Sequence, residues 1–226
     1  MDAFNDESFI HAFWYTALYA IVSLFIINVL AFLIAYLLTL GIKGANLFRT
    51  AFFMPNLIGG IVLGYIWSMI FNGVLGKINT SILMETRYGF WGLIILMCWQ
   101  QIGYMMIIYI AGIQNIPGEL IEAAKIDGAN EFQVFTKICI PICKGVITTC
   151  AILVFMDYWN MVEQPLLFFN DTDKYPLSIF LSKINAQEVG LAFAVATFYM
   201  IPSLLIFLYG EDQLVEGIAY QGGVKG

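Results

Sequence analysis

Charged residues are scarce in this sequence: Asp, Glu, Lys and Arg make up only 12% of its 226 residues, whereas hydrophobic residues make up 61%. Soluble globular domains usually contain about 25% charged residues. So few charges cannot cover a surface that faces water, and the mean hydropathy of +0.83 is equally high. The low charge excludes a soluble enzyme core, a disordered chain and a disulfide-stapled secreted module. It predicts an integral membrane protein.

Basic residues and histidine are also few. The formal net charge is −6 and the chain has one histidine, His11. Proteins that bind nucleic acid carry a basic patch for the phosphates, so we expect no nucleic-acid partner. The sequence shows no Ser-His-Asp set, no phosphate-binding loop and no carboxylate pair near a histidine. We therefore expect no catalytic residues in this chain, which is predicted not to be an enzyme.

The four cysteines do not form a pattern that would bind a metal. They are Cys98, Cys139, Cys143 and Cys150, and none forms a C-x-x-C pair. A structural zinc site needs four closely spaced nitrogen or sulfur ligands. All four cysteines fall in or beside apolar segments, where such a residue packs as a small hydrophobic side chain. We expect no metal site and no cofactor bound by this chain.

Five apolar segments are long enough to cross a membrane, since about 20 helical residues span the hydrocarbon core. The predicted spans are 12–40, 50–72, 89–116, 141–160 and 189–210. The fourth is the weakest because it contains Lys144 and Asp157, although Lys144 can extend to the headgroup region. Pro202 lies inside the fifth, where neighbouring helices can accommodate it. The sequence predicts an all-α bundle of about five transmembrane helices, with residues 1–226 forming one domain.

The distribution of Lys and Arg gives an orientation. The segments 41–49 and 119–144 and the C-terminal tail carry six of them, whereas the opposite set of loops carries four. Short cytoplasmic loops are enriched in Lys and Arg. We expect a multi-pass protein of the cell (plasma) membrane with its C-terminus in the cytoplasm and, because five spans is an odd number, its N-terminus outside.

The polar loop 117–141 between the third and fourth spans is the most informative segment. It predicts a short helix, a break and a second short helix. Pro117 suits a first helical turn, and Gly128 suits the left-handed position that closes a helix. Glu122 and Lys125 are three residues apart and are expected to pair on one helix face. A short, polar-faced cytoplasmic helix is suited to lie on the surface of another protein.

The order of residues in this loop is distinctive, because Glu122-Ala123-Ala124 is followed by Gly128 and then by Ile138-Cys139-Ile140-Pro141. This spaced set resembles the cytoplasmic "EAA" loop of permease subunits in binding-protein-dependent ABC importers, with Ile140 where leucine is usual. Further segments are similar to the maltose-type, multiple-sugar branch of these permeases. They are Ile116–Leu120, Ile126–Ala129, Trp159–Asn160, Phe48–Thr50, Phe52–Pro55, Ile66–Trp67, Val215–Gly217 and Gly223–Gly226.

The resemblance covers nearly the whole chain and implies the type I permease fold, with a short coupling helix. It implies a subunit that forms half of the path for a sugar or oligosaccharide in an ATP-driven importer. The implied partners are a second homologous permease, a cytoplasmic ATP-binding subunit dimer, an extracytoplasmic solute-binding protein and membrane lipid. ATP and Mg²⁺ would bind in the partner ATPase. Closure of that ATPase would tilt the bundle between two packed states. The residues implied in ATPase docking are Glu122, Ala123, Ala124, Asp127, Gly128 and Pro141.

Polar side chains inside the spans are candidates for the substrate path. A charge at the membrane centre costs about 2.5–3.5 kcal/mol on insertion scales, so such groups favour the bundle interior. Amides, carboxylates and aromatic faces suit a sugar. The candidates are Asn56, Gln100, Gln101, Tyr104, Asp157, Tyr158, Trp159 and Asn160. Trp and Tyr at span ends also serve as interfacial anchors, and Asn and Gln also link helices. Asp157 and Asn160 are the best candidates.

Several alternatives stay open. Relatives usually have six spans, so either the sequence begins after the first family helix or this is a five-helix variant. Residues 48–72 resemble the first permease of a pair, whereas Gly223–Gly226 is commoner in the second. The solute could be something other than a sugar. A secondary transporter would work without an ATPase and should show inverted repeats, and a membrane enzyme or assembly subunit would lack a transport role.

Overall fold

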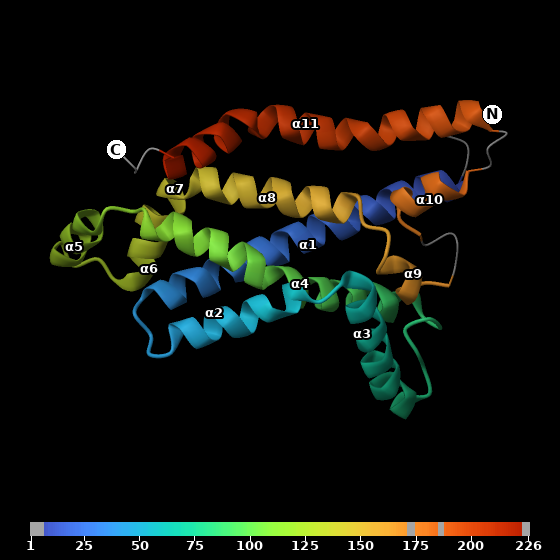
Figure 1. The fold of residues 1–226 in the computed structure, drawn as a ribbon, viewed down its shortest axis with the longest axis horizontal. Coiled ribbons are helices and arrows are strands. Elements are labelled where there is room, and N and C mark those ends of the chain that lie inside the picture. The colour runs from blue at the N-terminus through green and yellow to red at the C-terminus, as the bar shows by residue number, and fades with distance from the viewer. Residues whose placement is uncertain (1–6, 171–174, 185–187, 223–226) are drawn as a thin grey trace.

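The computed structural model describes residues 7–170, 175–184 and 188–222, with the side chains of the last helix described as far as Asp212. The similarity at Gly223–Gly226 lies outside these residues. The regular elements of the described chain are helices (Figure 1). In chain order they are α1 (Glu7–Thr39), α2 (Ala45–Phe53), η2 (Met54–Leu57), α3 (Gly60–Leu75), η3 (Gly76–Ile78), α4 (Thr86–Gln114), α5 (Gly118–Ile126), α6 (Glu131–Val134), η4 (a π-helical turn, Phe135–Cys139), α7 (Ile140–Ile142), α8 (Lys144–Trp159), α9 (Pro165–Phe168), α10 (Leu177–Lys183) and α11 (Val189–Gly222).

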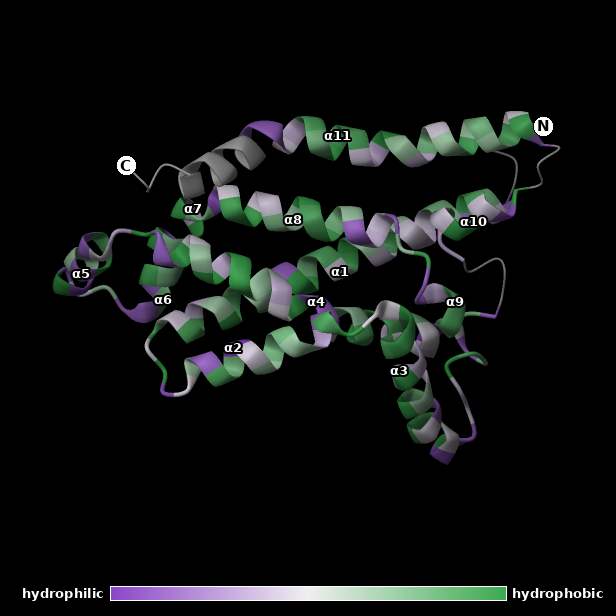
Figure 2. Cartoon of the chain, in the orientation of Figure 1, coloured by the Kyte–Doolittle hydropathy of each residue, from purple (hydrophilic) through white to green (hydrophobic). Residues whose placement is uncertain are grey.

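Four helical segments of the described chain are long and apolar enough to cross a membrane: α1, α3 with η3, α4, and α11 as far as Asp212. A fifth span results if the bent pair Glu131–Ile142 and Lys144–Trp159 counts as one. Figure 2 shows that these long helices are mainly hydrophobic, while hydrophilic residues gather at α5, α6 and the loops. The predicted all-α membrane bundle of about five spans is confirmed.

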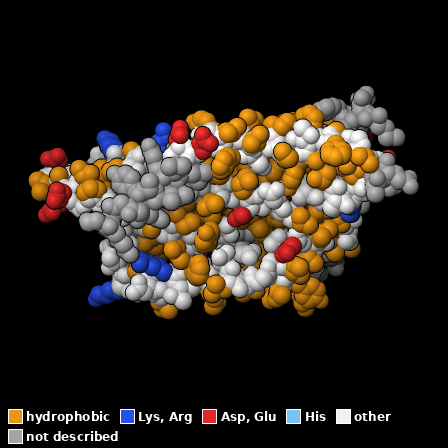
Figure 3. Space-filling model, turned by 45° about the horizontal axis from the view of Figure 1, so that its top comes forward, with side chains coloured by type: hydrophobic (Ala, Val, Ile, Leu, Met, Phe, Trp, Pro, Cys, Tyr) orange, Lys and Arg blue, Asp and Glu red, His pale blue; other side chains and the backbone are white. Residues whose placement is uncertain are grey.

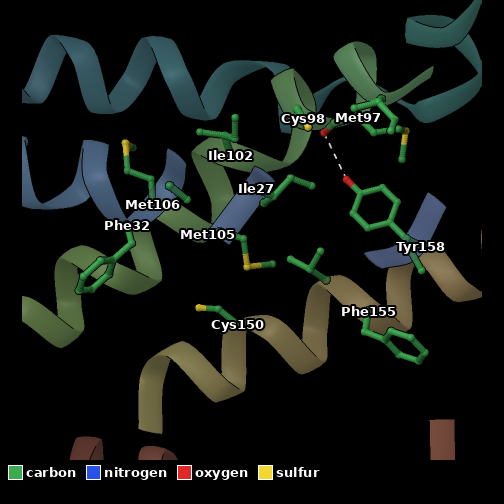
Figure 4. Close-up of a cluster of buried hydrophobic side chains, with 14 of the residues drawn as sticks. Ile27, Phe32, Met97, Cys98, Ile102, Met105, Met106, Cys150, Phe155 and Tyr158 are labelled. Atoms are coloured by element: carbon green, nitrogen blue, oxygen red, sulfur yellow. Dashed lines mark hydrogen bonds between the residues drawn. The ribbon is translucent and has the colours of Figure 1, made fainter. Parts of the chain in front are cut away.

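Helices α1, α4 and α8 pack together as the centre of the molecule. Their contact surface is apolar, with Ile27 of α1, Met105 of α4 and Cys150 of α8 completely buried in one cluster (Figure 4). All four cysteines are free and buried. The prediction that they pack as small hydrophobic side chains is therefore confirmed.

The structure breaks the predicted span 50–72. Helix α2 ends at Phe53, η2 makes a tight turn over Met54–Leu57, and α3 then leaves the bundle at an angle (Figure 1). Proline has no backbone N–H to continue a helix, and Pro55 stands at the start of η2. The apolar character of the segment was predicted, but the break at Pro55 was not.

The fourth predicted span, 141–160, also begins differently. Its continuous helix α8 starts at Lys144, and the helical segment before it is bent by 73° relative to α8. Pro141 is the second residue of α7, which follows directly on the π-helical turn η4. Pro141 cannot donate a hydrogen bond to the carbonyl four residues earlier, which weakens the helix near its end, and the bend itself falls at Cys143.

Two short helices between the last two spans escaped prediction. Helix α9 has four residues and α10 has seven, which is too short for a clear periodic signal. Helix α10 packs against α1 and α11, and the backbone N–H of Leu177 donates to Oγ1 of Thr16 at 2.8 Å. The last helix runs from Val189 to Gly222 and contains Pro202 in its interior, as expected.

Candidate functional site

The short helix α5 projects from one end of the molecule (Figure 1). Pro117 precedes its first residue, Glu119 lies in its first turn, and none of its residues is buried. An acidic residue there stabilises the positive end of the helix dipole. Gly128 has a φ of +85°, the left-handed conformation that glycine adopts without strain. The predicted sequence of helix, glycine break and second helix is confirmed.

The residues that the resemblance implies in docking are mostly accessible on this projection. Glu122, Ala123, Asp127 and Gly128 are exposed, Ala124 is half-buried, and Pro141 is exposed in α7. Two large apolar side chains on either side of Gly128 are also accessible: Ile126 is 79% exposed and Phe132 is 72% exposed. Such exposure of large apolar groups in a polar loop is a feature of interaction sites.

The predicted ion pair between Glu122 and Lys125 is wrong. Lys125 Nζ lies 2.8 Å from Glu131 Oε1 instead. The turn at Gly128 reverses the chain, and α6 begins with a capping box in which Asn130 and Gln133 bond reciprocally, so Glu131 comes to lie beside α5. Hydrogen bonds donated by Lys125 and by the Tyr36 hydroxyl hold the pKa of the Glu131 carboxyl below its ordinary value.

A second region is a polar cavity of about 390 Å³ between α4 and the end of α8. It brings together five of the predicted path residues, which are Gln100, Gln101, Asp157, Tyr158 and Asn160. Gln101 Nε2 donates to Asp157 Oδ2 at 2.8 Å. Asn56 and Tyr104 are not among its lining residues. Figure 3 shows acidic side chains in the middle of an otherwise largely hydrophobic face.

The candidates at the end of α8 differ in what they contact. The Tyr158 side chain is buried, and its hydroxyl donates to the carbonyl of Met97 at 3.2 Å. Trp159 Nε1 donates to the carbonyl of Tyr199 at 2.9 Å, which links α8 to α11. Asn160 is exposed and accepts a hydrogen bond from the Tyr199 hydroxyl at 2.6 Å. All four residues thus link α8 to a neighbouring helix, but Tyr158 and Trp159 are buried whereas Asp157 and Asn160 are exposed.

Sequence reasoning missed two polar residues of this cavity, Glu163 and Gln164. They follow the end of α8 and lie outside the predicted spans, so they were not considered. Gly60 lies against Gln164, since a Cβ at Gly60 would come within 2.4 Å of Gln164 Nε2. The close approach of Gln164 to the start of α3 depends on a residue without a side chain at that point.

Long apolar helices around a polar cavity, with an accessible short helix at one end, define a multi-pass membrane transport protein. Residues 27–214 match the family described as "Binding-protein-dependent transport system inner membrane component". The chain belongs to this family, and it is a permease subunit of an ABC importer.

The chain is similar to several transport permeases. It is 39% identical over 212 residues to the "Probable starch degradation products transport system permease protein AmyD" of Thermoanaerobacterium thermosulfurigenes, covering 87% of this chain and 73% of that one. It is 27% identical to the "Arabinooligosaccharides transport system permease protein AraP" of Bacillus subtilis, covering 91% and 72%.

A solved structure shares the fold. It is a "bacterial alginate ABC transporter in complex with alginate pentasaccharide-bound periplasmic protein", and the likeness has a TM-score of 0.79 at 20% identity. It covers 92% of this chain and 78% of the other. At this identity the likeness establishes the type I permease fold of this chain.

Proposed function

We propose that this permease forms half of a translocation path for a sugar or oligosaccharide, which an extracytoplasmic binding protein delivers. The observation that carries the proposal is the Gln101–Asp157 hydrogen bond in the polar cavity, because charged and amide groups are costly in a membrane unless they serve a path or a partner. The relatives named for starch degradation products and arabinooligosaccharides support a saccharide.

The proposed partners are a second permease, a cytoplasmic ATPase dimer that binds ATP and Mg²⁺, and the binding protein. Helix α5 is the proposed docking element for the ATPase, supported by its exposed position and by the exposed Ile126 and Phe132 beside it. The C-terminal end of α11 lies toward the same end of the molecule as α5 (Figure 1), which supports a cytoplasmic C-terminus. This chain itself is proposed to bind no cofactor.

The docking role is tested by uptake in proteoliposomes that contain the complete transporter. Glu122→Lys places a positive charge on the exposed face of α5, and Gly128→Asp strains the left-handed turn. Each variant is expected to abolish uptake while the permease stays in the membrane. The matched control is Glu85→Lys, an exposed carboxylate ahead of α4. Normal uptake by both docking variants would remove α5 from the mechanism.

The path role is tested at Asp157 and Asn160. Alanine at both positions removes the polar groups that the cavity presents and is expected to raise the solute concentration needed for half-maximal uptake several-fold. Unchanged uptake kinetics would exclude these residues from the path. The solute class follows from which compound stimulates ATP hydrolysis by the reconstituted complex: stimulation only by a non-sugar solute, or uptake without ATP, contradicts the proposal.

A further inference from the structure

The first span is joined directly to the cytoplasmic loop. Tyr36, in the last turns of α1, is only 7% exposed. Its hydroxyl lies 2.9 Å from Glu131 Oε2 and 3.1 Å from the carbonyl oxygen of Glu131, as donor to both. Its ring packs on Phe135, with 4.8 Å between the ring centroids. Glu131 is therefore held against α1 by two polar contacts and an adjacent aromatic contact.

The same carboxylate also holds α5. Glu131 Oε1 lies 2.8 Å from Lys125 Nζ, so one oxygen of Glu131 contacts α5 and the other contacts α1. The residues Lys125, Glu131 and Tyr36 form a continuous polar connection from the proposed docking helix to the first span. Charge-assisted hydrogen bonds of this kind are directional and short.

A cavity of about 470 Å³ lies next to this connection, lined among others by Tyr36, Ile121, Lys125 and Glu131. Helix α5 contributes no fully buried residue, and only Ile121 and Ala124 pack partly against the core, so packing alone holds its position relative to α1 weakly. The cavity leaves room into which α5 could shift. Unless a specific contact ties α5 to α1, a force on α5 would move α5 into this cavity without moving the bundle.

We propose that Glu131 is a positioning residue that couples α5 to α1 through Lys125 and Tyr36, so that a displacement of α5 moves the first span. The proposal rests on the proposed docking of α5 to the ATPase. Without the Glu131 carboxylate, α5 would follow the ATPase into the cavity while α1 stays in place. ATP would then be hydrolysed with little solute transported.

The connection contributes little to folding, which keeps the proposal open to test. The Lys125 and Glu131 side chains are 48% and 53% exposed, and exposed ion pairs of this kind add little stability. Tyr36→Phe removes a single oxygen atom and keeps the ring on Phe135. We therefore expect both Glu131→Ala and Tyr36→Phe to yield normal amounts of assembled transporter.

The experiment measures uptake and ATP hydrolysis separately in proteoliposomes that contain the complete transporter. Glu131→Ala is expected to lower the solute transported per ATP at least threefold while hydrolysis stays within twofold of the unaltered protein. Tyr36→Phe is expected to have a smaller effect of the same kind. The matched controls are Glu85→Ala and Tyr65→Phe, an exposed carboxylate and an exposed tyrosine away from this connection. Both controls should leave the ratio unchanged.

A charge exchange gives a second test. Lys125→Glu alone should lower the ratio, and Lys125→Glu combined with Glu131→Lys should recover part of it because the ion pair is restored. An unchanged ratio in Glu131→Ala overturns the coupling role, as does a parallel fall of uptake and hydrolysis, which marks a purely structural residue. If Glu122→Lys still abolishes uptake, only the coupling role fails. If Glu122→Lys is also normal, the docking of α5 fails with it.

Discussion

The packed centre of the bundle and its two outer helices differ sharply in burial but little in hydropathy. The most apolar stretch of α4 has a mean hydropathy of 1.8 and 61% of its residues are buried. The corresponding stretches of α3, with η3, and α11 have values of 1.5 and 2.2, yet only 11% and 6% of their residues are buried. Hydropathy therefore identifies a membrane helix but does not show what that helix contacts.

Close contact is not confined to the centre: it is also present at the start of α3, at Gly60, and in α11, at Gly210, but not at Gly73 near the end of α3. In a bilayer, helices gain nothing from hiding apolar surface, so small residues and specific bonds decide which helices associate. A Cβ at Gly103 of α4 would lie 1.8 Å from the carbonyl oxygen of Phe52, whereas a Cβ at Gly73 of α3 would meet nothing within 4 Å. The outer faces of α3 and α11 are exposed in this chain.

The largest expected difference between the two regions is between Gly103 and Gly73. Gly103→Ala forces α4 away from the end of α2, and because the contact is with backbone we expect a loss of about 3 kcal/mol, at the upper end for overpacking. Gly73→Ala should instead stabilise α3 by up to about 1 kcal/mol through helix propensity. The measurement is the free energy of unfolding in detergent micelles, and equal effects at both positions would refute the contrast.

The next largest difference in the free energy of unfolding is expected between two methionines, one in the centre and one on α3. Met105 of α4 is fully buried and Met69 of α3 is 61% exposed. Met105→Ala leaves a cavity in the centre and is expected to lower the free energy of unfolding by about 2–3 kcal/mol. Met69→Ala is expected to change it by less than about 0.5 kcal/mol, as for other surface positions. A loss at Met69 as large as that at Met105 would mean that α3 is packed within this chain.

Two tyrosines, Tyr158 in the centre and Tyr65 on α3, test how much a single hydrogen bond contributes to the packing of the centre. The buried Tyr158 hydroxyl donates to the carbonyl of Met97, whereas Tyr65 of α3 is 61% exposed. Tyr158→Phe should lower the free energy of unfolding by about 1 kcal/mol, the usual net value of such a bond. Tyr65→Phe should have no measurable effect on the isolated permease. If the Tyr158 variant were equally neutral, its bond to α4 would not contribute to the centre.

The sequence was sufficient for the class of fold but not for its interruptions. Long uncharged segments predicted the bundle, and Pro117 and Gly128 predicted the shape of the loop. The break at Pro55 was missed because hydropathy averages over a segment and hides a single residue without an N–H. The short helices α9 and α10 were missed because four to seven residues give no reliable period.

The candidate site was only partly predictable, for a similar reason. Polar residues inside the spans identified Asp157 and its partner Gln101, because a charge in a membrane segment is conspicuous. Glu163 was missed because it lies outside the predicted spans. The contact of Lys125 with Glu131 could not be read from spacing because it depends on the turn at Gly128. Helical spacing favoured Glu122 as the partner of Lys125, and the reversal at Gly128 placed Glu131 closer.

The most direct measurement is photo-crosslinking from α5 in the assembled transporter. All four native cysteines are buried, so a cysteine introduced as Ala123→Cys, at an exposed position of α5, can be labelled selectively with a thiol-reactive photoprobe. Met84→Cys, in the 74% exposed position ahead of α4, is the matched control. We predict a crosslink from position 123 to the ATPase subunit and none from position 84. The absence of any ATPase crosslink from position 123 would contradict the account.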